Sequence, residues 1–221
     1  MEIKMDRIFN FDNVFFRAFD KIINVFCLSI LWIIFSIPVF TIGASTTALY
    51  YTVNKVLTHG RGYVFREFWG AFKSNFKQAT VIWLILLAAG VFMGWDAYIM
   101  KQFYDAGQAI GKLFAFFYIM LGFLVVWALY IFPNIARFEN TNRAIMKNAA
   151  LMALASLPKT VLMVIMLAAF ILADWFFPFL IIFIPAAFMW AWSGILEKIF
   201  RRFMSEEDIA AEDERNREYK N

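Results

Sequence analysis

Long apolar stretches alternate with blocks of lysine and arginine along this chain of 221 residues. The clear apolar stretches cover, approximately, residues 22–37, 79–95, 113–132, 160–173 and 179–196. A helix needs about 20 residues, each adding about 1.5 Å, to cross the hydrocarbon core of a membrane. The shorter stretches reach this length only with their flanking residues. The pattern predicts an all-α protein, a polytopic bundle of transmembrane helices.

The positions of the basic residues change the number of spans that we expect. With five crossings, the basic residues before and after the first stretch would lie on opposite sides of the membrane, which the positive-inside rule disfavours. A return of residues 39–57, after a turn at Pro38 and Gly43, removes this conflict. All but two of the 21 lysines and arginines then lie in the cytoplasm, and Lys101 and Lys112 remain outside. We therefore expect about six spans, five full and one short or re-entrant, in the cytoplasmic membrane with both termini cytoplasmic.

Amphipathic segments with aromatic stripes precede three of the predicted spans. The clearest stripe has charged residues on its other side and consists of Phe65, Phe68, Trp69, Phe72 and Phe76. Residues 11–26 show the same pattern, and residues 134–156 a weaker form of it. Such segments are typical of helices that lie in the membrane surface. We expect three interfacial elbow helices, each leading into a hairpin; the alternative is that one of them docks a partner's cytoplasmic surface.

A short motif adds a hint of internal repetition. The pattern ALYxxxN occurs at residues 48–54 and again at residues 128–134, each time at the end of a predicted returning span. Repeats are common in transporter architectures. Four identical residues in an apolar background also arise by chance, so the motif suggests a repeat of elbow, outward span and inward span without establishing it.

Composition agrees with a membrane protein and narrows its partners. Hydrophobic residues make up 62% of the chain, against about 45–50% in soluble domains, so the excess must face lipid. The formal charge of +4 is accounted for by the basic flanks of the spans, and we expect no nucleic-acid partner. Cys27 is the single cysteine, which excludes an intrachain disulfide. We expect residues 1–204 to form one transmembrane domain and residues 205–221 a charged cytoplasmic tail, either a solvated helix or a disordered end, with docking as the alternative.

The sequence lacks the groups that catalysis normally requires. His59 is the only histidine, and no phosphate-binding glycine loop is present. The centres of the predicted spans hold no ionisable residue, whereas ion-coupled transport usually places such groups there. We expect no catalytic residue, no metal site and no cofactor, and a protein that is not an enzyme.

The densest group of small and hydroxyl-bearing residues lies in the short second span. It consists of Gly43, Ala44, Ser45, Thr46, Thr47 and Ala48. Small residues allow close approach of membrane helices, and hydroxyl groups bond locally or across helices. We interpret this segment as a helix-packing or partner-contact surface; the alternative is a substrate-lining role.

Residues 37–51 (IPVFTIGASTTALYY), together with the stripe at 65–76 and the NFKQ sequence at 75–78, resemble the YesL-like family of small bacterial integral membrane proteins. That family has no established catalytic residues. The resemblance implies a context among carbohydrate-utilisation genes, beside components of sugar-importing ABC transporters. We therefore expect an accessory protein that assists the assembly, stability or activity of a carbohydrate ABC importer by contacting its permease subunits. The alternative is a small-solute permease or channel that acts alone, with residues 45–47 and Asn54 lining the path.

Overall fold

The structure, a computed structural model, describes residues 14–218 of the chain and the side chains of residues 19–214 among them. All regular elements in this part of the chain are helical, which confirms the all-α prediction. The α-helices are α1 (Val14–Ser36), α2 (Ile42–Thr52), α3 (Val64–Asp105), α4 (Phe114–Arg137), α5 (Asn142–Ala155), α6 (Leu157–Phe176), α7 (Ile184–Phe200) and α8 (Glu206–Glu218). Short helical turns join them: the 3₁₀ turns η2 (Val39–Thr41), η4 (Ala109–Leu113) and η5 (Pro178–Ile182), and the π-helical turn η3 (Val53–Thr58).

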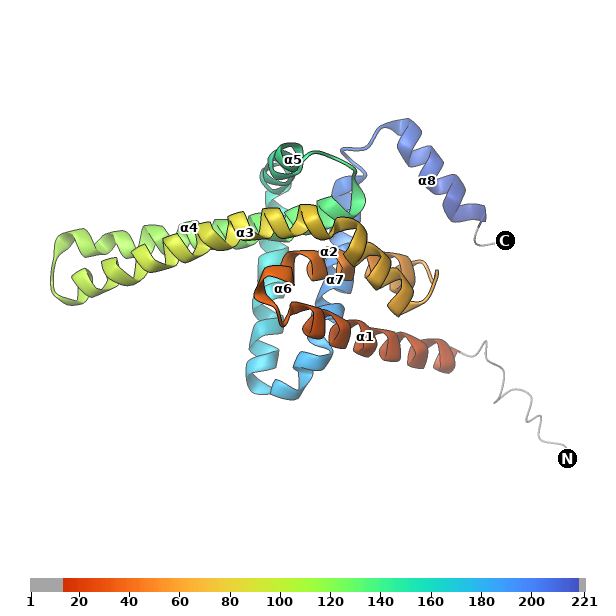
Figure 1. The fold of residues 1–221 in the computed structure, drawn as a ribbon, viewed down its shortest axis with the longest axis horizontal. Helices are drawn as coiled ribbons and strands as arrows, with labels where there is room; N and C mark the ends of the chain where they lie inside the picture. The colour runs from red at the N-terminus through yellow and green to blue at the C-terminus, as the bar shows by residue number, and fades with distance from the viewer. Residues whose placement is uncertain (1–13, 219–221) are drawn as a thin grey trace, which may run out of the picture.

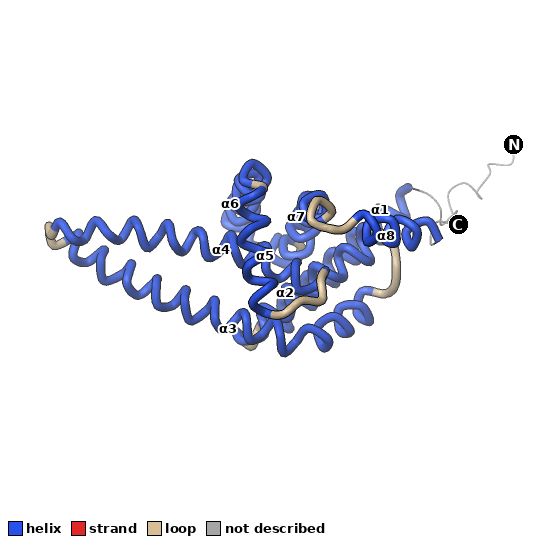
Figure 2. The backbone as a smooth tube through the Cα atoms, turned by 90° about the horizontal axis from the view of Figure 1, so that it is seen from above, coloured by secondary structure: helices blue, strands red, loops and turns tan. Residues whose placement is uncertain are grey.

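Two antiparallel hairpins dominate the architecture. Helices α3 and α4 form a long hairpin whose tip projects well beyond the rest of the chain (Figure 1). The α6–α7 hairpin runs across it, so α6 is foreshortened when the molecule is viewed from above (Figure 2). The short helix α2 lies where they cross and contacts α1, α3, α4 and α7.

Among the described residues, four helical segments are long and apolar enough to cross a membrane. They are Phe19–Ser36, Val64–Asp105, Ala109–Arg137 and Leu157–Phe176. Large apolar side chains remain exposed along them, among them Phe92 at 68% and Trp95 at 65%, as lipid-facing residues would be. The chain is therefore a helical membrane protein.

The other two predicted spans are shorter than these four. Helix α2 has 11 residues and is about 17 Å long at 1.5 Å per residue, roughly half of the hydrocarbon core. Residues 39–57 thus contain a short helix between two tighter turns. Helix α7 has 17 residues and begins at Ile184, with Pro185 in its first turn. This proline opens the helix, where its missing N–H is not needed.

Gly43 is needed for close packing and does not form the turn. Helix α2 already begins at Ile42, and a Cβ atom on Gly43 would lie 2.6 Å from Cβ of Trp83 and 2.7 Å from the carbonyl oxygen of Ala79. The turn consists of Pro38 and η2. The assignment of Gly43 to the turn is therefore corrected: its lack of a side chain lets α2 approach α3.

The hydroxyl groups of α2 bond within the protein. Ser45 lies 2.7 Å from the hydroxyl of Ser36 on α1, and Thr47 donates to the carbonyl of Gly43 at 2.9 Å. Thr46 accepts from the indole N–H of Trp32 at 3.1 Å. The bonds of Ser45 and Thr46 join α1 and α2 into a hairpin.

The aromatic stripe at 65–76 belongs to the first half of α3. This helix continues through the stripe into the span without interruption over 42 residues, and its first half bends (Figures 1 and 2). Phe68 and Phe72 are buried, and both pack with Trp69 against Phe35 of α1. Phe65 and Phe76 are exposed. The expected separate interfacial helix is thus a bent helix whose aromatic face lies mainly against α1.

The other two predicted elbows differ from each other. Residues 14–26 continue into α1 without a break, and residues 11–13 lie outside the described residues. The elbow expected at residues 134–156 is met only in part: residues 134–137 end α4, and α5 is the separate helix before α6. Ile145 and Ala149 of α5 are buried against the core.

Candidate functional site

The ends of several helices meet at one end of the bundle, which we call the polar end. Lys55 of η3 forms an ion pair with Glu67 of α3 at 2.7 Å, and this hydrogen bond raises the pKa of Lys55. Gln78 of α3 donates to the carbonyl of Asn140, in the link between α4 and α5, at 2.7 Å. Segments that the charge pattern assigns to one side of the membrane are therefore in contact.

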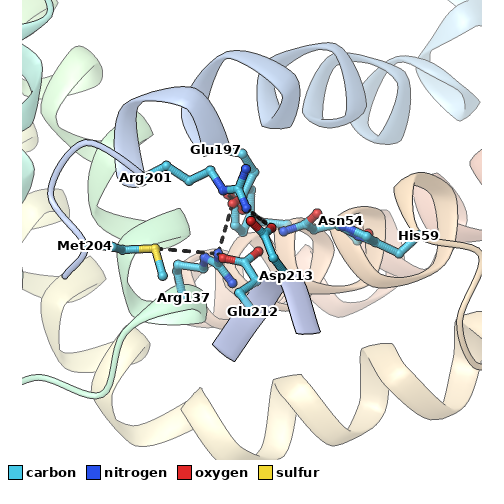
Figure 3. A network of polar contacts seen from close by, with 9 residues as sticks. Asn54, His59, Arg137, Glu197, Arg201, Met204, Glu212 and Asp213 are labelled. Atoms are coloured by element: carbon cyan, nitrogen blue, oxygen red, sulfur yellow. Dashed lines mark hydrogen bonds and ion pairs between the residues drawn. The ribbon is translucent and has the colours of Figure 1, made fainter. Parts of the chain in front are cut away.

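At the centre of the polar end is the carboxylate of Glu197, on α7. Its Oε1 atom accepts hydrogen bonds from the hydroxyl of Tyr50 at 2.7 Å and from Nδ2 of Asn54 at 2.6 Å. Its Oε2 atom lies 3.3 Å from Nη2 of Arg137, at the end of α4 (Figure 3). Glu197 thus joins α2, η3, α4 and α7.

Local helix geometry explains how two residues of one segment reach this carboxylate. Tyr50 and Asn54 are four residues apart, the spacing that places side chains on one helix face. Asn54 lies in the π-helical turn η3, a widened form of helix that often occurs at functional sites. The ring nitrogen Nδ1 of His59 is 2.7 Å from the carbonyl oxygen of Asn54 and closes this turn.

The C-terminal helix α8 adds a second carboxylate to Arg137. Oε2 of Glu212 lies 2.5 Å from Nη2 of Arg137, and Asp213 forms an ion pair with Arg201 (Figure 3). Ser205 begins α8 as its N-cap, accepting from the N–H of Asp208 at 3.1 Å. Residues 206–218 therefore form a helix that is largely exposed over residues 206–214 and contacts the bundle through Glu212 and Asp213.

The charges of this network are largely shielded from water. The side chains of Arg137, Glu197 and Glu212 are 20%, 19% and 13% exposed. Removing such charges from water costs several kcal/mol per ion unless a partner compensates. Two carboxylates around Arg137, and two neutral donors on Glu197, supply that compensation.

Two clefts flank the network. A cleft of about 860 Å³ lies between the first half of α3 and the α4–α5 link, and its polar lining includes Glu67, Gln78, Arg137, Glu139, Asn140 and Thr141. A second cleft, of about 470 Å³, is lined by Asn54, His59, Glu197, Lys198, Arg201 and Asp213, among others. Arg137 and Glu197 thus line different clefts, and their ion pair separates the two.

The repeated ALYxxxN motif has a structural counterpart. Tyr50 and Tyr130 are both buried, and the hydroxyl of Tyr130 lies 2.8 Å from that of Thr160 on α6. Asn134 is fully buried, with Nδ2 3.4 Å from the sulfur of Met152 on α5. In both copies, tyrosine and asparagine join the end of a returning helix to other helices.

Of the residues singled out in the sequence, Asn54 and the first copy of the ALYxxxN motif reach this site, through Asn54 and Tyr50, whereas the small-residue segment 43–48 lies beside it. Of the segment 43–48, Thr46 is half-buried and the other five residues are buried where α2 packs on its neighbours. The sequence reasoning overlooked Arg137, Glu197 and Glu212. The available signal was Glu197 itself, the single acidic residue between Asp174 and Glu206, placed at the end of an apolar span.

The central carboxylate of the polar end is already paired within the protein. Among the described residues, no three histidine, cysteine, aspartate or glutamate side chains are grouped so that they could hold a metal ion. The carboxylate of Glu197 already accepts two hydrogen bonds and one ion pair. What the polar end offers to another molecule is the polar surface of its two clefts.

A family model matches part of the chain. The family model described as "Protein of unknown function, DUF624" matches residues 25–97. This region, about a third of the chain, runs from α1 into α3 and includes Tyr50 and Asn54, but not Arg137, Glu197 or α8. No curated protein and no solved structure matches the chain.

Proposed function

We propose that this protein is a YesL-like, non-enzymatic accessory protein of the cytoplasmic membrane that assists the assembly, stability or activity of a carbohydrate ABC importer. The family match at residues 25–97 includes the IPVFTIGASTTALYY sequence on which the resemblance rests. The importer enters the proposal through that resemblance. The observation that carries the binding role is the polar cleft of about 860 Å³ at the polar end.

The orientation follows from the basic residues. The positive-inside rule places the segments around Lys55, Arg137 and Lys198 in the cytoplasm, and they belong to the polar end. Both clefts then open toward the cytoplasm. Lys101 lies near the other end of the α3–α4 hairpin, where it pairs with Asp105, and this tip faces outward.

The large cleft has the chemistry of a protein-docking surface. Its walls carry both signs of charge, such as Glu67 and Arg137, together with amide and hydroxyl groups. Gln78 bonds the carbonyl of Asn140 at 2.7 Å and the side chain of Asn142 at 3.0 Å, which joins the two walls. Walls fixed in advance reduce the entropy lost on binding. A polar loop or helix end of a permease subunit suits this surface.

The permease alternative has less support. It requires the hydroxyl groups of residues 45–47 and the amide of Asn54 to line a path. Ser45 and Thr47 are buried and lie within hydrogen-bond distance of carbonyls of their own helix, and Asn54 donates to Glu197. These groups are engaged in packing α2, so we retain the accessory role.

The proposal is tested by co-purification from the native bacterium, in mild detergent, under conditions that induce the importer. Ser74 is exposed and lines the large cleft, so Ser74→Trp fills it. Lys77 is exposed on the same helix outside the cleft, and Lys77→Trp is the matched control. We expect permease subunits to co-purify with the wild type and with Lys77→Trp, and to be lost with Ser74→Trp. Isolation of the wild-type protein without importer subunits would contradict the proposal.

A further inference from the structure

Helix α8 is attached to the bundle mainly through its acidic side chains. Figure 1 shows it at the periphery, beyond a link that follows α7. Glu212 pairs with Arg137, and Asp213 pairs with Arg201. Ile209 is the single large apolar residue of α8, so apolar burial contributes little to its attachment. The pair of Asp213 with Arg201 is exposed, and such a pair is weak and weakens further with salt.

The surface beneath α8 is cationic. Around the smaller cleft, the bundle contributes Lys198 and Arg201, with Arg137 beside it, against the single carboxylate of Glu197. Glu212 and Asp213 supply the balancing negative charge. Without α8, this surface, which we call the arginine seat, carries an excess of positive charge and attracts an acidic group.

The bundle side of the network remains paired when α8 is removed. Arg137 keeps its ion pair with Glu197 at 3.3 Å, and Glu197 keeps the hydrogen bonds from Tyr50 and Asn54. Arg201 is 42% exposed on its side chain and becomes solvated. No charge is left buried alone, so α8 can leave at modest cost.

We propose that α8 is a releasable intramolecular ligand, and that the arginine seat binds an acidic helical segment of another protein when α8 leaves. The bound helix defines the chemistry of that partner. Two consecutive carboxylates, Glu212 and Asp213, meet arginines from two different helices of the bundle. This inference does not depend on the identity of the importer or on the large cleft.

The surroundings of the seat favour a protein segment over a lipid headgroup. The exposed face of α8 carries Glu206, Glu207, Asp208 and Glu214, and a helix with so many charges faces water. The seat therefore opens toward the aqueous phase. A helical segment with adjacent carboxylates matches the chemistry of the present occupant.

The test measures the binding of a fluorescent peptide with the sequence of residues 205–214, which contains no lysine or arginine, to the full-length protein in phosphatidylcholine nanodiscs. The opened variant is Glu212→Gln/Asp213→Asn. The matched control is Glu206→Gln/Glu207→Gln, which removes the same charge from α8 outside the two ion pairs. We expect the opened variant to bind the peptide at least tenfold more tightly than the wild type or the control. Adding Arg201→Gln to the opened variant should reverse most of the gain.

A second measurement uses the wild-type protein and so does not depend on the folding of any variant. Trypsin cleaves after Arg201 and Arg202, in the link before α8. Excess peptide should displace α8 and raise the cleavage rate, whereas a peptide that carries the substitutions Glu212→Gln and Asp213→Asn should not. Equal peptide affinity of all variants, or an unchanged cleavage rate, would overturn the proposal. Peptide binding is also measured in nanodiscs of phosphatidylglycerol, an anionic lipid. If the peptide binds in phosphatidylcholine but not in phosphatidylglycerol, a lipid headgroup occupies the arginine seat, and the proposal is overturned.

Discussion

Tyr50 and Tyr130 occupy the same position in the two copies of one short motif, and each directs a buried hydroxyl to a different helix. Tyr50 donates to Glu197 of α7 at 2.7 Å, and Tyr130 is 2.8 Å from the Thr160 hydroxyl of α6. The partners differ in charge. Tyr50 donates to a carboxylate that belongs to an ion-pair network, whereas Tyr130 meets a neutral hydroxyl that also contacts backbone carbonyls.

This difference predicts unequal effects of removing the two hydroxyl groups. Hydrogen bonds to charged groups contribute about 1.5–3 kcal/mol, against about 0.5–1.5 kcal/mol for neutral ones. Tyr50→Phe should therefore lower the melting temperature of the detergent-solubilised protein more than Tyr130→Phe. Scanning fluorimetry on the native tryptophans measures both. Equal losses would contradict the stronger hydrogen bond assigned to Tyr50.

The ion pair between Arg137 and Glu197 leads to a second prediction. Glu197→Ala leaves Arg137 with Glu212 alone and removes the acceptor of Tyr50 and Asn54, so we expect a loss of about 3 kcal/mol in the free energy of unfolding. The double substitution Arg137→Leu/Glu197→Leu removes both charges, and should be less destabilising than Glu197→Ala. Chemical denaturation in mild detergent gives the comparison. A double variant that is less stable than the single one would contradict this account.

Gly43 and Gly94 form a matched pair for testing close packing. A Cβ atom on Gly43 would lie 2.7 Å from a carbonyl oxygen of α3, whereas one on Gly94 meets nothing within 4 Å. Gly43→Ala should cost about 1–3 kcal/mol through overpacking. Gly94→Ala should be neutral or stabilising, by up to about 1 kcal/mol, because alanine favours the helix. Thermal unfolding measures both, and similar effects at the two sites would contradict the packing assigned to Gly43.

The hydrophobic pattern was sufficient to predict the helical class, because a membrane span must be a long apolar helix. The blocks of basic residues were sufficient to predict which helix ends lie together at the polar end, because basic residues stay on one side of the membrane. They did not predict that Phe68 and Phe72 face α1, since an aromatic stripe has the same spacing whether it packs on lipid or on another helix. The partnership of Arg137 with Glu197 and Glu212 was also missed. Pairing between charges on distant helices depends on tertiary structure, which periodicity does not contain.

The predicted orientation is tested by labelling single cysteines in a Cys27→Ala background. Gln108 is exposed near the tip of the α3–α4 hairpin, and Lys77 is exposed in the first half of α3. Residues 78–95 between them carry no charge and suffice to cross the membrane. Because basic residues are retained in the cytoplasm, a membrane-impermeant maleimide should label Gln108→Cys in intact cells and Lys77→Cys only after permeabilisation. Labelling of Lys77→Cys from outside would place the polar end, with both clefts and α8, on the external side, and the proposed docking of cytoplasmic segments would then be excluded.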